Sequence, residues 1–265
     1  MRVVCWNMRR AKAESAAWRH LQESAPDVAL LQEVGTVPES MLEHYAHRAE
    51  RPVGRTGRPQ RFLTVLLAKG EIVRPIALRA SSPRVQALLD QFRACIVAYE
   101  VKLGDGRRLV AVSVYSPAWS INHESLDAQD VSRVKLTKAD RIWVIDLLHD
   151  ALCHSESIQD HECIIAGDFN TCELLDKGPN GRGGNREYLD RMMALGLTEC
   201  LRTHQRALTP TFRHPRGSVR NQIDHMFAST QLATRLVECG VGSRDRVFGV
   251  SPMLSDHLPL IADFR

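Results

Sequence analysis

The sequence has no hydrophobic run long enough to cross a membrane. Its longest apolar stretches, such as VALL at 28–31 and TVLLA at 64–68, have the length of a β-strand. A membrane span needs roughly 18 apolar residues. The N-terminus, MRVVCWNMRR, also lacks the apolar segment and the small-residue cleavage site of a signal peptide. We therefore expect a cytoplasmic protein with no membrane partner.

Regularly spaced cysteines are missing as well. The seven cysteines are odd in number and include no C-x-x-C pair, which argues against a disulfide framework and a cysteine-rich zinc module. The chain also lacks internal repeats, Pro/Ser-rich linkers and low-complexity tracts, and its 44% hydrophobic and 25% charged residues are typical of a globular protein. We expect a single domain over residues 1–265, and a monomer.

Short apolar runs rich in β-branched residues recur along the whole chain, separated by turn residues and a few helical patterns. They predict strands at 2–6, 28–32, 62–68, 95–103, 108–115, 163–166, 221–228, 234–241 and 258–264. Apolar residues at three- and four-residue spacing predict helices at 11–24, 131–154 and 185–195. Strands joined mostly by loops favour an α/β fold of two packed sheets flanked by helices over a doubly wound parallel sheet.

Two segments, 51–70 and 201–222, contain no Asp or Glu and are interpreted as functional loops. Their basic residues are Arg51, Arg55, Arg58, Arg61 and Lys69 in the first and Arg202, Arg206, Arg213, Arg216 and Arg220 in the second. Such loops create a local positive field, and arginine is well suited to bidentate phosphate contacts. Two alternatives stay open, because basic loops are often only solvated and an arginine-rich genome gives the same bias.

Polar side chains follow several apolar runs, where each predicted strand leaves the core. They are Asn7 after VVCW, Glu33 after VALLQ, Asp168 and Asn170 after CIIAG, and Asp256 and His257 after VSPML, while Asp224 interrupts QIDHMFA. Each could simply close a turn or cap a helix. If they converge, their oxygens suit Mg²⁺ or Mn²⁺, and the histidine can stabilise negative charge or move a proton. That combination would serve metal-assisted phosphoryl transfer to water.

Six motifs in this order resemble those of the endonuclease/exonuclease/phosphatase superfamily. They are W-N-M at 6–8, L-L-Q-E-V at 30–34, V-Y-S-P at 114–117, I-A-G-D-F-N-T at 165–171, Q-I-D-H-M-F at 222–227 and L-S-D-H-L-P-L at 254–260. Together they span nearly the whole chain. The resemblance implies a four-layered α/β sandwich of two central mixed β-sheets flanked by helices, with the active site at one end of the sheets.

The resemblance also implies a divalent-metal site. Asn7 and Glu33 match metal-site positions of the family, with Glu33 the principal ligand of Mg²⁺ or Mn²⁺. Asp256 matches a further ligand of the metal or of a metal-bound water. These three side chains are therefore expected to lie together at the site.

The remaining matched residues imply catalytic roles. Asp168 resembles the residue that orients or deprotonates the attacking water, with assistance from Asn170. His257 resembles the histidine that contacts the scissile phosphate, with Asp224 as its carboxylate partner. Tyr115 lies where many members place a tyrosine that contacts the phosphate or stabilises the leaving group, although it could instead close the edge of a strand.

The chain departs from three subgroups of the family. Ala118 stands where many nucleases carry an Asn, which puts one phosphate contact in doubt. Asn221 and Gln222 replace the aromatic residue that lines the sugar pocket of abasic-site enzymes, so a dedicated abasic-site endonuclease is disfavoured. Ala166 takes the place of the tryptophan in the inositol phosphatase signature.

These features favour a Mg²⁺- or Mn²⁺-dependent nuclease that cleaves DNA or RNA by in-line attack of water. Arg61, Arg213, Arg220 and Trp119 are the predicted substrate contacts, although Trp119 could pack the insertion that carries it rather than stack on a base. The alternative function is a phosphatase or phosphodiesterase that acts on small molecules or lipid head groups. A catalytically silent binding module is disfavoured, because every candidate catalytic position holds the expected residue type.

Overall fold

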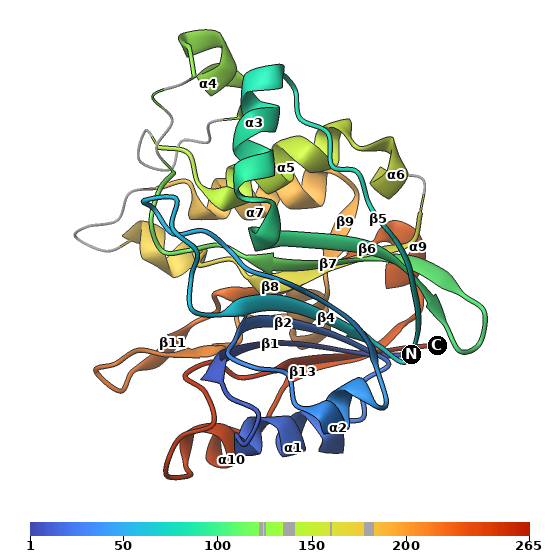
Figure 1. Cartoon of the computed structure of the whole chain (residues 1–265). Helices are drawn as coiled ribbons and strands as arrows, with labels where there is room; N and C mark the ends of the chain where they lie inside the picture. The colour runs from blue at the N-terminus through green and yellow to red at the C-terminus, as the bar shows by residue number, and fades with distance from the viewer. Residues whose placement is uncertain (122–123, 125, 135–140, 160, 178–182) are drawn as a thin grey trace.

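Four layers make up the computed structural model: helices, a sheet, a second sheet and further helices (Figure 1). The structure describes residues 1–121, 124, 126–134, 141–159, 161–177 and 183–265. About 30% of these described residues lie in helices and about 35% in strands. The prediction of an α/β four-layered sandwich is therefore confirmed.

The first sheet has six strands in the order β13-β14-β1-β2-β4-β3. Their bounds are β1 Arg2–Ala11, β2 Val28–Val34, β3 Ala46–Glu50, β4 Leu63–Ala68, β13 Leu236–Val241 and β14 Leu260–Phe264. β1 and β2 run parallel, and the other neighbours are antiparallel. The sheet is therefore mixed, with its parallel pair in the centre.

The second sheet repeats this plan in the order β5-β6-β7-β8-β12-β9. Its strands are β5 Gly70–Pro75, β6 Ile96–Leu103, β7 Arg108–Tyr115, β8 Cys163–Asp168, β9 Leu197–Glu199 and β12 Asp224–Ser229, and a separate hairpin pairs β10 Phe212–Arg213 with β11 Val219–Asn221. β7 and β8 form the parallel pair. The sheets pack face to face through apolar side chains, among them Val3, Leu30, Ala111 and Ile164.

A polar link crosses the packed interior between the sheets. The Gln32 amide donates to Ser113 Oγ at 3.0 Å, and both residues are fully buried. Because a buried polar group is costly without a partner, this bond favours one alignment of β2 against β7. Gln32 directly precedes Glu33, and Ser113 lies two residues before Tyr115. The bond therefore helps to position Glu33 and Tyr115 at the same end of the sandwich.

Helices cover both outer faces (Figure 1). The helices of the described residues are α1 Ala16–Glu23, α2 Glu39–Leu42, α3 Pro83–Gln91, α4 Ala128–Val134, α5 Val144–His154, α6 Glu156–Gln159, α7 Asn185–Ala194, α8 Cys200–Gln205, α9 Thr230–Ala233 and α10 Arg244–Phe248, with short 3-10 turns at Arg93–Cys95 and Glu173–Lys177. Apolar residues of α3, α5 and α7 pack on the second sheet, and those of α1, α2 and α10 pack on the first. α8 and α9 instead contribute to the core between the sheets through Cys200, Leu201 and Leu232. No helix among the described residues is long and apolar enough to span a membrane.

Two of the predicted helices have different bounds in the structure. The segment 131–154 is not one helix: α4 ends at Val134, α5 begins at Val144, and Ile142 between them forms a bridge with Ile121. Residues 135–140 of that prediction lie outside the described residues. Asp146 accepts a hydrogen bond from the Trp143 backbone N–H at 2.7 Å. This bond caps the helix at Trp143, so α5 begins at Val144 rather than at the predicted residue 131.

The predicted helix at 11–24 also starts too early, because Ala11 still belongs to β1 and Ser15 caps α1 by accepting from the Ala17 N–H. The two segments interpreted as loops carry regular structure as well. Segment 51–70 contains β4, and segment 201–222 contains α8 and the β10-β11 hairpin. The strand predicted at 62–68 matches β4, whereas the short helix α8 and the short strands β10 and β11 have little hydrophobic periodicity and were not predicted.

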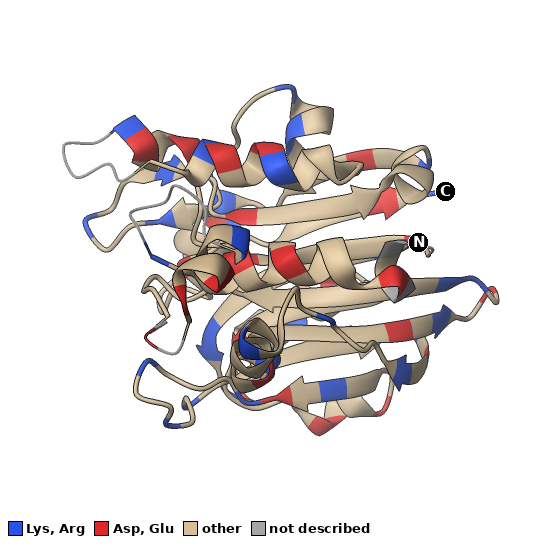
Figure 2. Cartoon of the chain, turned by 90° about the horizontal axis from the view of Figure 1, so that it is seen from above, with Lys and Arg blue, Asp and Glu red and all other residues tan. Residues whose placement is uncertain are grey.

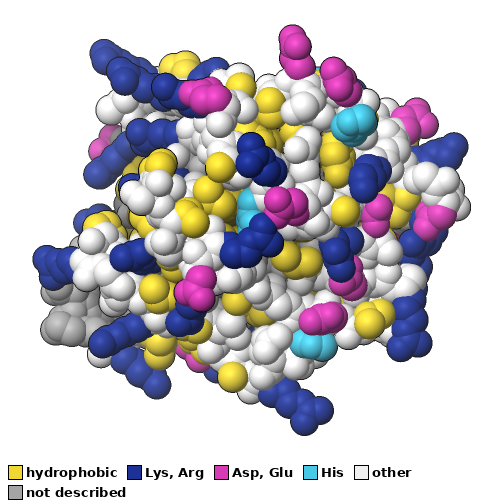
Figure 3. Space-filling view, turned by 90° about the horizontal axis from the view of Figure 1, so that it is seen from below, with side chains coloured by type: hydrophobic (Ala, Val, Ile, Leu, Met, Phe, Trp, Pro, Cys, Tyr) yellow, Lys and Arg dark blue, Asp and Glu magenta, His cyan; other side chains and the backbone are white. Residues whose placement is uncertain are grey.

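Basic residues lie at both ends of the sandwich (Figure 2, Figure 3). The chain termini meet at one end of the sandwich, where the amino group of Met1 donates to the Phe264 carbonyl at 2.7 Å. Lys and Arg lie along the loops at the opposite end, on the left of Figure 2. Seen from below, basic side chains project from both the left and the right edge of the molecule (Figure 3). A polyanion approaching the end opposite the chain termini would meet a positive rim.

Candidate active site

Several predicted residues meet where the strands end, opposite the chain termini. Asp168 is the last residue of β8, Asp224 is the first of β12, and the two are direct partners in the antiparallel pairing. Tyr115, the last residue of β7, pairs with Asp168 on its other side. Asn7 lies in β1 of the facing sheet and donates from Nδ2 to Asp168 Oδ2 at 3.1 Å. The site therefore joins both sheets.

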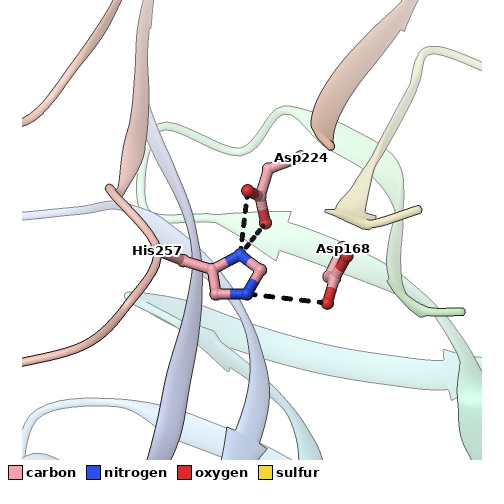
Figure 4. A group of neighbouring side chains, drawn as sticks. All are labelled: Asp168, Asp224 and His257. Carbon is pink, nitrogen blue, oxygen red and sulfur yellow. Dashed lines mark hydrogen bonds and ion pairs between the residues drawn. The ribbon is translucent and has the colours of Figure 1, made fainter. Parts of the chain in front are cut away.

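His257 is clamped by Asp224. Its Nδ1 lies 3.0 Å from Oδ1 and 2.9 Å from Oδ2 of Asp224, while its Nε2 lies 3.9 Å from Asp168 Oδ2 (Figure 4). Thr211 donates from Oγ1 to Asp224 Oδ2 at 2.6 Å, and this fixes the carboxylate. Trp6 holds the backbone of the histidine by donating from Nε1 to the His257 carbonyl at 2.8 Å.

Asp168 is buried and surrounded by hydrogen-bond donors. Its Oδ1 accepts from the Asn170 N–H at 3.0 Å, and its Oδ2 faces the amides of Asn170 at 3.3 Å and Asn7. Burial raises the pKa of Asp168 to about 7, and the charge of Asp224 adds to this effect, although His257 opposes it. A carboxyl group with a pKa near 7 can gain and lose a proton under neutral conditions.

The His257 ring, unlike the Asp168 carboxyl, is stabilised in its charged form. Burial alone would lower its pKa, but the charges of Asp224 and Asp168 outweigh burial and raise the pKa to about 10. At neutral pH the ring is therefore cationic, and both of its nitrogens are donors. One donor faces Asp224, and the other faces the space next to Asp168.

Tyr115 closes the site on the side of Glu33. Its ring packs edge-on against Phe62, with 5.0 Å between the ring centroids. Burial raises the pKa of the Tyr115 hydroxyl far above its ordinary value of 10, and the hydrogen bond and negative charge of Glu33 act in the same direction. The phenol therefore stays protonated and can donate a hydrogen bond.

Oxygen ligands for a cation are available at the same end. Glu33 lies 4.0 Å from Arg10 and also accepts a hydrogen bond from the Tyr115 hydroxyl, and Asp256 lies 3.8 Å from Arg9. These carboxylates and the Asn7 amide oxygen are hard oxygen donors of the kind that Mg²⁺ and Mn²⁺ prefer.

Among the described residues, Asp168, Asp224 and His257 also have possible ligand atoms within 4.8 Å of one another. Nδ1 of His257 is already hydrogen-bonded to Asp224, so Nε2 is the ring atom that faces Asp168. The cluster therefore has the groups for proton transfer and phosphate contact as well as possible ligands for a cation.

The predicted substrate contacts do not gather in the same way. Arg213 donates to the Phe248 carbonyl at 3.1 Å, and its guanidinium lies over the Phe248 ring, so it braces α10. Trp119 is half-buried and packs edge-on against Phe92. This contact favours the packing interpretation of Trp119. Arg61 and Arg220 are exposed and remain available to a ligand.

Sequence reasoning missed the residues that position the site. Thr211 holds Asp224, and Ser255 donates to the Asn7 carbonyl at 2.7 Å while it accepts from the His257 N–H at 3.1 Å. The position of Ser255, two residues before His257, was the one local signal. Nothing in the sequence near Thr211 indicates its partner, because the contact depends on tertiary folding.

Comparison with known proteins identifies the family of the chain. The model of the Endonuclease/Exonuclease/phosphatase family matches residues 4–257. The chain therefore belongs to this family, whose members are phosphoester hydrolases. A search of curated proteins found no match.

Solved structures with the same fold include nucleases. An AP endonuclease from Archaeoglobus fulgidus has a TM-score of 0.68 at 18% identity, over 100% of this chain and 99% of that one. The APE2 catalytic domain from Xenopus laevis has a TM-score of 0.67 at 17% identity, over 100% and 91%. A 3' phosphatase from Neisseria, solved with a product DNA hairpin, has a TM-score of 0.60 at 19% identity, over 100% and 99%. At these identities the similarity shows the fold.

Proposed function

We propose that this protein is a metal-dependent nuclease that hydrolyses phosphodiester bonds in DNA. The observation that carries the proposal is the arrangement of Asp168, Asp224 and His257 at the end of the sandwich opposite the chain termini. In-line hydrolysis of a phosphodiester needs a proton acceptor for water and a positive group for the phosphate oxygens. A buried carboxylate with a pKa near 7 beside a cationic histidine supplies both.

In the proposed reaction, Asp168 accepts a proton from the attacking water as the water oxygen bonds to phosphorus. Asn7 and Asn170 keep the carboxylate oriented through their hydrogen bonds. His257 donates from Nε2 to a non-bridging oxygen, and Asp224 holds its ring in place. The bond from phosphorus to the leaving oxygen breaks, and that oxygen takes a proton from solvent. When the substrate binds, the Tyr115 hydroxyl exchanges its hydrogen bond to Glu33 for one to the phosphate.

A divalent ion completes the site, as it does in the enzymes of this family. Glu33, Asp256 and Asn7 are the residues we assign to it. A bound Mg²⁺ or Mn²⁺ would neutralise charge on the phosphate oxygens. We expect Glu33→Gln to raise the Mg²⁺ concentration needed for half-maximal activity by about tenfold or more, because it removes a charged ligand.

DNA is the favoured substrate for two reasons. Arginines line the loops at the site end of the sandwich, which suits a polyanion better than a small phosphoester (Figure 2). The fold is also that of several DNA-acting enzymes, including one solved with product DNA. RNA and small phosphoesters are the outcomes against which the proposal is tested.

The test is a cleavage assay with the purified protein. The substrates are supercoiled plasmid, single-stranded DNA, duplex DNA with a nick or a 3'-phosphate, RNA, and a small phosphodiester such as bis-p-nitrophenyl phosphate. Each is incubated with Mg²⁺, with Mn²⁺ and with a chelator. We expect DNA cleavage that needs the metal. Preferred cleavage of RNA, or cleavage of the small ester alone, would overturn the assignment of DNA.

Two variants control this assay. Asp168→Asn is expected to lower turnover by about 10²–10⁴-fold, because it removes the proton acceptor while keeping the shape of the side chain. Asp263→Asn removes a carboxylate from β14 at the opposite end and should leave activity unchanged. Equal cleavage by Asp168→Asn and the wild-type protein would mean that Asp168 is not the base or that another nuclease is present.

A further inference from the structure

β1 bulges immediately after Asn7, beside the active site. Asn7 pairs with Gln32 of β2, and Ala11 pairs with Val34. Between these two pairs β1 advances by four residues while β2 advances by two, so the extra residues of β1 form a bulge. Within the bulge Arg9 has a φ of 46° and Arg10 a φ of 60°. Two consecutive arginines in the left-handed region are unfavourable for residues with a Cβ. Such strain persists only where the surroundings impose it.

The bulge is held by contacts from both sides. The Arg9 N–H donates to Asn7 Oδ1 at 3.0 Å, and Asn7 in turn donates to Asp168. Directly after β2, the Gly35 N–H donates to the Ala11 carbonyl at 2.9 Å. A Cβ on Gly35 would lie only 2.7 Å from the Arg10 carbonyl, so this close approach requires glycine. The arginine backbone is thus tied directly to the proposed catalytic carboxylate.

The two side chains reach different carboxylates of the site. Arg9 Nε lies 3.8 Å from Asp256, and Arg10 Nε lies 4.0 Å from Glu33. Arg10 also rests over the Phe62 ring at 5.8 Å, which orients its guanidinium. Both arginines remain about half exposed or more, at 50% and 63%. Neither forms a close bidentate pair, so both have donors to offer a ligand.

A hollow of about 340 Å³ lies beside the bulge. Its charged lining consists of Arg9, Arg10, Lys12 and Glu14, which gives an excess of positive charge. The hollow adjoins a larger one of about 640 Å³ along α1, with Ser15 and Leu254 in both linings. A DNA backbone that leaves the active site along these two hollows would contact the guanidinium groups of Arg9 and Arg10 first.

We propose that Arg9 and Arg10 form a phosphate clamp that grips the backbone phosphates of DNA next to the scissile bond. This inference rests on the nuclease function proposed above and names a binding element for its substrate. The clamp uses the planar, bidentate donors of arginine. The strained bulge keeps both groups at the mouth of the site, so the free protein does not have to order them when DNA binds.

The test measures binding without cleavage. Fluorescence anisotropy of a labelled duplex is recorded in a chelator, over a range of salt concentrations, for the wild-type protein and Arg9→Gln/Arg10→Gln. Loss of two phosphate contacts should lower the magnitude of the slope of log affinity against log salt by about 2. At fixed salt we expect affinity to fall by about tenfold for each arginine. Cleavage should show a raised KM with a smaller change in kcat.

A matched control separates local contacts from net charge. Lys69→Gln/Arg107→Gln removes the same two charges from the other end of the sheets, since Lys69 follows β4 and Arg107 precedes β7. Its salt slope should stay close to that of the wild type. Equal effects of the two double variants would overturn the clamp.

A second variant separates binding from folding. Arg9→Gly/Arg10→Gly suits the left-handed backbone and should melt no lower than the wild type, yet bind DNA as weakly as the Gln variant. Wild-type affinity in this variant would overturn the clamp even if the nuclease assay succeeds. If the wild-type protein neither binds nor cleaves DNA, the proposed function itself fails.

Discussion

His257 Nδ1 lies within 3.0 Å of both carboxylate oxygens of Asp224, deep at the junction of the two sheets. The bond links residues that are 33 positions apart and keeps a buried ring cationic. In the proposed mechanism this charge contacts the phosphate, so Asp224 acts through the histidine.

Asp224→Asn should therefore lower kcat by about 10²–10⁴-fold, with a smaller effect on KM. The amide cannot stabilise a buried imidazolium as a carboxylate does, and the pKa of His257 should fall. Single-turnover cleavage and an NMR titration of the histidine would measure the two effects. Thr211→Val should be milder, since it removes one hydrogen bond to Asp224. Wild-type turnover in Asp224→Asn would contradict the assignment.

Trp119 offers a test between packing and base stacking. Because its ring contacts Phe92 at the edge of the core, Trp119→Ala should lower the free energy of unfolding by about 2 kcal/mol. DNA affinity of the folded variant should stay unchanged. Urea denaturation and anisotropy give the two quantities. Normal stability combined with weak binding would instead support a stacking role.

Gly167, directly before Asp168, is predicted to tolerate no side chain. A Cβ there would lie 1.8 Å from the Val114 carbonyl oxygen, against the backbone of the paired strand β7. Gly167→Ala should therefore cost about 3 kcal/mol of stability and displace Asp168. Gly104→Ala is the matched control, because nothing lies within 4 Å of its Cβ position. Equal denaturation midpoints for the two variants would contradict this account.

The sequence predicted the strands that lie in the middle of the sheets. The strand at 108–115 matches β7 in full, because continuous apolar β-branched residues mark a strand that is buried on both faces. β3 was missed, since AHRAE is an edge strand without a buried residue and has no hydrophobic pattern. α3 was missed although Ser82 and Pro83 form a typical helix start.

The side chains that meet at the candidate active site could be singled out from the sequence because each lies at or near the end of an apolar strand. Alternation along β12 also explains why His225, next to Asp224, faces the other way and bonds the Thr171 carbonyl at 2.8 Å. The Arg9-Arg10 bulge could not be predicted. It depends on Gly35, which only the fold brings beside β1, and no local pattern marks two arginines as left-handed.

Glu100 supplies a prediction about stability and pH that is independent of the active site. It lies in β6 with its side chain buried, and it accepts from Arg108 at 2.7 Å and from Arg74 at 2.6 Å on the flanking strands. The hydrogen bond from Arg108 lowers the pKa of Glu100 below its ordinary value of 4.5, burial opposes this effect, and Arg74 adds to it. The ionised form is therefore favoured in the folded protein.

Because the folded pKa lies below the unfolded one, the stabilising contribution of Glu100 is complete above pH 4.5 and is lost as pH falls through the folded pKa. Glu100→Gln should lower the free energy of unfolding by about 1–2 kcal/mol at pH 7. The gap between variant and wild type should narrow below pH 4. Urea denaturation of both proteins from pH 3 to 8 measures this difference in the free energy of unfolding. Because the other carboxylates titrate in both proteins, their contribution cancels when the value of the variant is subtracted from that of the wild type. A gap that stays constant across this range would show that the two arginines act by packing alone.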